Sequence, residues 1–127
     1  MKNLLSGMHI LILEDEFLIA MDVESLCRDH GATAVTIAQE MPETGPQKPD
    51  FDAAILDIMI GGESTLPFAR MLQEQGIPFI FASGYTDSEE ILTPFPGVTL
   101  VGKPYSGDEL IEAVALACGR IARSGSA

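Results

Sequence analysis

The sequence predicts an α/β protein in which a doubly wound, five-stranded parallel sheet carries helices on both faces. Short continuous apolar runs, such as HILIL at His9–Leu13 and PFIFA at residues 78–82, are typical of strands covered on both faces. Segments with apolar residues at helical spacing alternate with these runs. The 127 residues suffice for one domain, and we expect its core to span about residues 8–121.

The expected elements follow one another in a regular order. Strands are expected at residues 9–13, 34–38, 51–56, 78–82 and 98–101, and helices at residues 16–30, 64–75 and 106–121, with one or two helical turns at 87–92. Gly31 is the expected C-terminal stop of the first helix. Gly61 and Gly62 predict a loop, and Ser64 or Thr65 is the expected N-cap of the second helix.

Composition excludes several classes of protein. With 7 basic and 19 acidic residues the formal charge is −12, and no cluster of Lys or Arg offers a surface for nucleic acid. No apolar run reaches the roughly 18 residues of a membrane span, and the N-terminus does not resemble a secretory signal, so we expect a cytoplasmic protein. Cys27 and Cys118 are expected to be small buried thiols rather than metal ligands.

Polar residues stand where the predicted strands end. The first strand is followed by Glu14 and Asp15, and the third by Asp57. The fourth is followed by Ser83, and the fifth by Lys103. Because ligands of such sheets bind beyond the carboxyl ends of the strands, we expect these carboxylates, the hydroxyl and the ammonium to converge on one rim.

This ordered set resembles the receiver domain of two-component signalling, over about residues 8–120. The resemblance implies a flavodoxin-like receiver fold with strand order 2-1-3-4-5 and a phosphoryl group transferred from a histidine kinase. The segments FASGY at 81–85 and DIMIGGE at 57–63 are similar to the "FAT GUY" subgroup of receivers, which are often single domains paired with kinases of the HWE type.

The acidic residues are the candidate metal ligands. Clustered carboxylates repel one another unless a cation intervenes, and Mg²⁺ is a hard ion that prefers oxygen. We expect Asp15 and Asp57 to bind Mg²⁺ directly and Glu14 to bind it directly or through water. The resemblance adds the backbone carbonyl of Met59 as a further ligand.

Asp57 is the expected nucleophile and would form an acyl phosphate. Phosphoryl transfer depends mainly on positioning and on neutralising oxygen charge, which the Ser83 hydroxyl and the Lys103 ammonium would supply beside the metal. Each residue also has an ordinary structural explanation: acids favour a helix start, Ser-Gly favours a turn, and a surface Lys is common.

One position departs from the family pattern. Most receivers carry Tyr or Phe three residues before the Lys, where this chain has Leu100. We therefore expect the switch region to be Gly84, Tyr85 and Thr86, with activation ordering or displacing residues 84–97 and Tyr85 as the aromatic that moves.

Three other functions share parts of this pattern. A haloacid-dehalogenase-type phosphatase needs Asp-x-Asp, but the second position here is Met59. A flavodoxin-like cofactor module needs a Gly- and hydroxyl-rich loop after the first strand, where this chain has Glu14-Asp15-Glu16. A degenerate receiver that only binds proteins is the third. The sequence favours a phosphoacceptor rather than an enzyme, with output through a partner protein or with a role as a phosphate sink or shuttle. It identifies neither the kinase nor the output protein, and a homodimer stays open.

Overall fold

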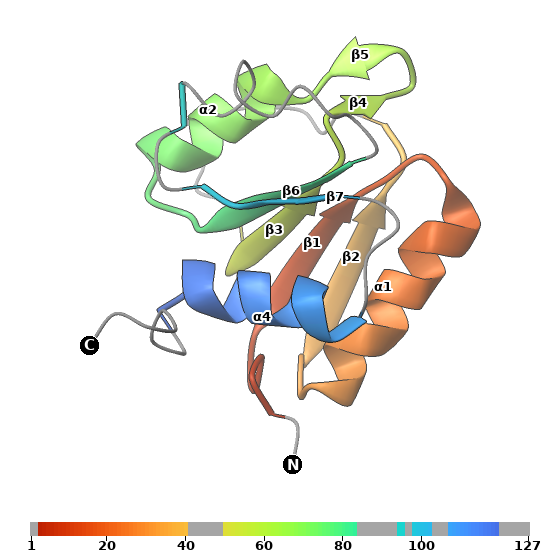
Figure 1. Ribbon diagram of the computed structural model, residues 1–127, viewed down its shortest axis with the longest axis vertical. Helices are drawn as coiled ribbons and strands as arrows, with labels where there is room; N and C mark the ends of the chain where they lie inside the picture. The colour runs from red at the N-terminus through yellow and green to blue at the C-terminus, as the bar shows by residue number, and fades with distance from the viewer. Residues whose placement is uncertain (1–2, 41–49, 84–93, 96–97, 103–106, 120–127) are drawn as a thin grey trace.

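The sheet of the computed structural model has five parallel strands in the order β2-β1-β3-β6-β7 (Figure 1). The structure describes residues 3–40, 50–83, 94–95, 98–102 and 107–119. The strands are β1 His9–Leu13, β2 Ala34–Ala38, β3 Ala53–Leu56, β6 Phe79–Ser83 and β7 Leu100–Gly102. Counting only these parallel strands, the order is 2-1-3-4-5, so the predicted doubly wound sheet is confirmed.

Helices cover both faces of the sheet (Figure 1). Helices α1 (Phe17–Asp29) and α4 (Gly107–Ala117) bury side chains such as Val23 and Val114 in one apolar cluster, while α2 (Leu66–Glu74) buries Leu72 in the other. Side chains of β1 alternate between the two clusters, with Ile10 and Ile12 in the first and Leu11 and Leu13 in the second. This double burial explains the continuous apolar runs, because a strand packed on both faces has no polar side.

Gly31 ends α1, as predicted. Its φ is 97°, and its N–H donates to the Arg28 carbonyl while the Ala32 N–H donates to the Cys27 carbonyl, which is the Schellman arrangement. A β-carbon at Gly31 would also lie 3.0 Å from the Cα of Ser6. Glycine is therefore favoured at this position both by the backbone conformation and by the close approach of the N-terminal segment.

A hairpin was not foreseen between β3 and α2. Strands β4 (Met59–Ile60) and β5 (Glu63–Ser64) pair antiparallel. Their two-residue turn consists of Gly61 (φ 57°) and Gly62 (φ 82°), and positive φ at both turn residues is the type I′ pattern. The glycine pair did mark the turn, but strands of two residues are too short to show an alternating pattern.

The start of α2 lies at the predicted pair of residues, Ser64 and Thr65. Thr65 occupies the N-cap position but makes no side-chain capping bond, whereas the hydroxyl of Ser64 accepts the Leu66 N–H at 3.1 Å. The Thr65 side chain is fully buried and its hydroxyl points back to the backbone that follows β3.

Other boundaries moved slightly. Strand β3 begins at Ala53 rather than at residue 51. The exposed Asp52 precedes it, with its N–H donating to the His9 carbonyl and its carboxylate accepting the His9 N–H. The helical turns expected at 87–92 and the first residue of the last helix, Ser106, lie outside the described residues. Within the described part of the chain, no helix has the length and apolar character needed to cross a membrane.

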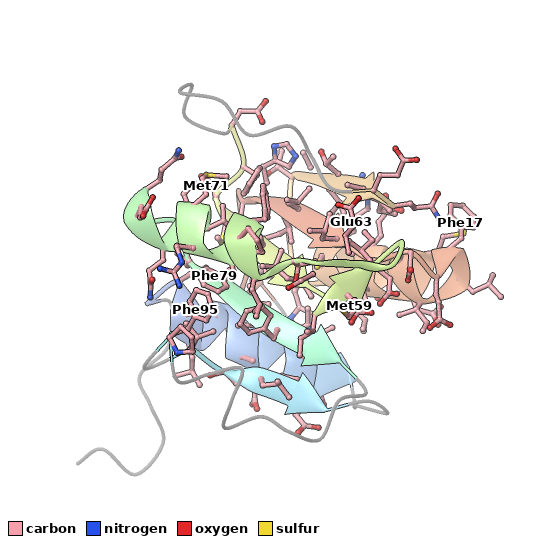
Figure 2. The ribbon with its side chains drawn as sticks, turned by 90° about the horizontal axis from the view of Figure 1, so that it is seen from above. Phe17, Met59, Glu63, Met71, Phe79 and Phe95 are labelled. Carbon is pink, nitrogen blue, oxygen red and sulfur yellow. The ribbon has the colours of Figure 1, made fainter. Side chains whose placement is uncertain are left out.

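Phe95 anchors the connection between β6 and β7. It is 1% exposed, and its ring makes edge-on contacts with Phe79 and Phe81 at centroid distances of 5.8 and 5.7 Å. Figure 2 shows the Phe79 and Phe95 side chains close together, while Phe17 lies at the outer edge of the molecule. Partly buried Leu100 packs on the same cluster.

Replacing Phe95 with Ala is expected to lower the free energy of unfolding by about 3–5 kcal/mol, because a large buried side chain is removed and a cavity remains. Phe17→Ala removes the same side chain where it is 55% exposed and should change stability far less. Urea unfolding of both variants measures the difference. Equal losses would show that Phe95 does not anchor the connection.

Cys27 is a buried thiol, as predicted. Burial, aided by the nearby Glu24 carboxylate and opposed by Arg28, raises its pKa to about 12. The reactive thiolate is therefore scarce near neutral pH. Iodoacetamide should leave Cys27 unmodified in the folded protein and alkylate it in denaturant, as followed by peptide mass mapping. Rapid alkylation under native conditions would contradict its burial.

Candidate functional site

The candidate site lies beyond the carboxyl ends of β1 and β3. These two strands are paired in parallel with Leu13 opposite Leu56, so the residues that follow them reach the same edge. The Asp57 N–H donates to the Leu13 carbonyl at 2.9 Å, and the Glu14 N–H donates to the Ala38 carbonyl at 3.1 Å. The backbone hydrogen bonds of the sheet thus extend to Glu14 and Asp57 and fix the positions of their backbones.

This edge is also the topological switch point of the sheet, where successive connections lead to opposite sides. The connection after β1 runs through α1 on one face, whereas the connection after β3 runs through α2 on the other (Figure 1). The sheet is therefore split between these strands, which is the position where doubly wound proteins bind their ligands.

The three predicted carboxylates meet there. Glu14, Asp15 and Asp57 each offer one oxygen, and these oxygens lie within 4.8 Å of one another. Glu14 is buried, Asp57 is half-buried and Asp15 is exposed. Two of the acids come from one strand end and the third from its neighbour, so tertiary pairing of β1 with β3 brings them together.

Backbone amides point at each of these carboxylates. Glu14 Oε2 accepts the Glu16 N–H at 3.1 Å, Asp57 Oδ1 accepts the Ile58 N–H at 2.7 Å, and Asp15 Oδ2 accepts the Gly61 N–H at 3.0 Å. Each amide places its partial positive charge against a carboxylate oxygen and partly offsets the repulsion among the acids.

The donor set fits a divalent cation such as Mg²⁺. All three side chains are hard oxygen donors, they are close enough to share one ion, and the exposed Asp15 leaves the cluster reachable from solvent. Mg²⁺ commonly binds through one to a few carboxylates and retains several waters.

Met59, whose carbonyl was predicted as a further ligand, lies in strand β4 of the hairpin. The Thr65 N–H donates to the Ile58 carbonyl at 2.8 Å, so this pair occupies a hydrogen-bonded position of the hairpin. Because such positions alternate with non-bonded ones, the neighbouring Met59–Ser64 pair directs its carbonyls away from the partner strand. The Met59 carbonyl is thus not used by the hairpin, and its role as a ligand stays a prediction.

The sequence did not indicate the backbone amides that bond to the acids, among them that of Gly61, or the buried hydroxyl of Thr65. The single hydrogen of this hydroxyl is shared between the carbonyls of Asp57 and Ile58, the second at 3.0 Å. The glycine pair and the threonine were visible in the sequence, but only as a loop and a helix cap. Nothing in their spacing signals a contact with the acids.

The remaining predicted residues are only partly described. Ser83 is the last residue of β6 and pairs with Gly102 at the end of β7, so the backbone at both strand ends lies on the expected rim. The Ser83 side chain, Lys103 and the expected switch residues Gly84, Tyr85 and Thr86 lie outside the described residues. Their roles stay predictions.

Solved structures resemble this fold closely. A response regulator receiver protein from Sinorhizobium medicae matches with a TM-score of 0.73 and 24% identity, covering 91% of this chain and 98% of that one. The non-phosphorylated HemR receiver domain from Leptospira biflexa matches with a TM-score of 0.72 and 23% identity, covering 92% and 98%. The chain has the fold of response-regulator receiver domains.

A longer protein matches over part of its length. The response regulator PhyR from Brucella abortus has a TM-score of 0.70 and 25% identity over 92% of this chain, which spans 51% of PhyR. No protein-family model and no curated protein matches the sequence.

Mg²⁺ is expected to raise the thermal stability of the protein at low ionic strength, because it relieves repulsion among the three acids. At a concentration several times its Kd, the gain should be on the order of 1 kcal/mol. Asp15→Asn should lose most of this gain, as followed by melting temperature in a magnesium titration.

Asp52→Asn is the matched control, since Asp52 is an exposed Asp at the amino end of β3. It should keep the full response to Mg²⁺. A wild-type melting temperature that does not change with millimolar Mg²⁺ would count against the metal site.

Proposed function

We propose that this chain is a phosphoacceptor receiver domain of a two-component phosphorelay, in which a histidine kinase phosphorylates Asp57 with the help of Mg²⁺. The observation that carries the proposal is the meeting of Glu14, Asp15 and Asp57 at the β1–β3 edge of a receiver fold. Together these provide a nucleophile, a cation site and an opening to solvent.

Asp57 would act as the nucleophile. A carboxylate oxygen attacks the phosphorus of a phosphohistidine, an O–P bond forms, the P–N bond breaks, and the imidazole leaves with the electron pair and takes up a proton. The Ile58 N–H on Asp57 Oδ1 holds the carboxylate group in one orientation during the attack. When bound by the acidic cluster, Mg²⁺ supplies charge neutralisation for the phosphoryl oxygens.

Ser83 and Lys103 complete the proposed site. A hydroxyl after β6 and an ammonium after β7 would each neutralise a different phosphoryl oxygen, as their positions directly at the strand ends suggest. The protein would then be a substrate of a kinase rather than an enzyme that turns over an external phosphoester.

The phosphatase alternative lacks its general acid. It needs an ionisable side chain two residues after the nucleophile, and the residue there is Met59, which is half-buried and packs against the apolar cluster on the α2 side. A thioether has no proton to give a leaving group. The flavodoxin-like alternative is disfavoured by the buried carboxylate of Glu14, which stands where a phosphate loop would be needed.

The start of α1 is a candidate contact surface for the phosphodonor. Phe17, Leu18 and Met21 are 55%, 78% and 46% exposed and follow directly after the acids. Exposed large apolar side chains grouped in this way suit a protein partner. We assign the partner, on the resemblance to the FAT GUY subgroup, to a cytoplasmic histidine kinase of the HWE type, with a separate protein as output.

Incubation with Mg²⁺ and a small acyl-phosphate donor is expected to add one phosphoryl group per chain. Asp57→Asn should abolish the addition, because an amide is not a nucleophile toward phosphorus, whereas Asp52→Asn should leave it intact. Intact-mass measurement at mildly acidic pH reports the labelling. Equal labelling of wild type and Asp57→Asn would show that the acceptor is another residue.

A further inference from the structure

Thr65 is a buried polar residue beside the candidate site. Its side chain is 0% exposed, and it sits between the β4–β5 hairpin and α2. A threonine at an N-cap normally accepts an amide hydrogen from the first turn of the helix, but this hydroxyl makes no such bond. It donates instead to the backbone of Asp57 and Ile58.

Residue 65 thereby holds both carbonyls that follow β3. The hydroxyl is directed at the Asp57 carbonyl and at the Ile58 carbonyl, which lies 3.0 Å away. The Ile58 carbonyl also accepts the backbone N–H of Thr65 at 2.8 Å. The segment that leaves Asp57 is therefore tied to the base of the hairpin by two different groups of one residue.

The contact with Asp57 has a direct consequence for its carboxylate. The Asp57 carbonyl and the Ile58 N–H belong to the same peptide group, which is planar and rigid. Thr65 holds one side of this plane, and the N–H on the other side donates to Asp57 Oδ1 at 2.7 Å. Accepting a hydrogen bond at the carbonyl also strengthens the N–H of the same peptide as a donor.

We propose that Thr65 is a positioning residue for the Asp57 carboxylate, acting through the peptide group between residues 57 and 58. The hydroxyl fixes the orientation of this peptide group. Its N–H then orients the Asp57 carboxylate toward Glu14 and Asp15. The consequence for metal and phosphoryl binding rests on the proposed function, whereas the hold on the peptide group does not.

A purely structural role makes a different prediction. If the hydrogen bonds of the hydroxyl serve only to satisfy a buried polar group, its removal lowers stability without changing the local geometry of Asp57. Thr65→Val keeps the shape and removes the hydroxyl, while Thr65→Ser keeps the hydroxyl and removes a methyl group. Ser64→Ala is the matched control, since it removes a neighbouring hydroxyl that bonds to Leu66 rather than to the acids' backbone.

The first measurement uses metal-free protein and follows the Ile58 amide by ¹H–¹⁵N NMR. Thr65→Val is expected to shift this resonance and to lower its hydrogen-exchange protection relative to other residues around β3 by roughly fivefold, the equivalent of one net hydrogen bond. Thr65→Ser and Ser64→Ala should keep the wild-type shift and relative protection. If Thr65→Val does not fold, Thr65→Cys, with a weaker donor, takes its place.

The second measurement titrates Mg²⁺ into the same proteins and follows amides near the acids. Thr65→Val is expected to bind Mg²⁺ roughly fivefold more weakly than wild type, and Thr65→Ser within about twofold of it. An unchanged Ile58 amide together with unchanged Mg²⁺ affinity in the variant lacking the hydroxyl would overturn the positioning role.

The two measurements separate the two proposals. If wild type itself does not bind Mg²⁺ or accept a phosphoryl group, the proposed function fails, and the Ile58 amide still decides whether Thr65 holds the peptide group. If wild type binds Mg²⁺ and Thr65→Val loses only global stability, the function stands and the positioning role is wrong.

Discussion

The repulsion among Glu14, Asp15 and Asp57 is the constraint on which the architecture of the candidate site depends. Parallel pairing of β1 with β3 brings these carboxylates to one edge, and the oxygens of the cluster lie within 4.8 Å of one another. Such crowding opposes folding unless charge is offset. The structure offsets it with an amide on each acid, from Glu16, Ile58 and Gly61. A cation would complete the compensation.

The β4–β5 hairpin supplies one of those amides and adds a contact to the backbone beside Asp57. Its tip brings the Gly61 amide to Asp15, and its base brings residue 65 to the peptide group after Asp57. A type I′ turn is compact enough to return the chain within a few residues, and it needs positive φ at both turn positions. The glycine pair therefore serves the site through its backbone, because the Gly61 N–H donates to Asp15.

The two apolar clusters give this edge a rigid support. Ile55 faces the α1–α4 side and Leu56 faces the α2 side, so the strand that carries Asp57 is held by packing on both faces. On the α2 side, Phe79, Phe81 and Phe95 form a contact network around the strand that ends at Ser83. Leu100 packs against this same cluster, to which Phe79, Phe81 and Phe95 contribute their rings.

The sequence by itself determined the fold class, most of the elements and the identity of the acidic cluster. Burial on both faces requires a continuous apolar run, as at His9–Leu13, and a positive φ favours glycine, as at Gly31. Both requirements are visible directly in the sequence. The order of strand ends then indicated that Glu14, Asp15 and Asp57 would meet. Only the tertiary structure decided that the Gly61 N–H donates to Asp15 and that the Thr65 hydroxyl donates to the Asp57 carbonyl instead of capping α2. A hydroxyl has several partners within reach of its own segment, and which one it takes depends on where the hairpin and the strand end come to lie after packing.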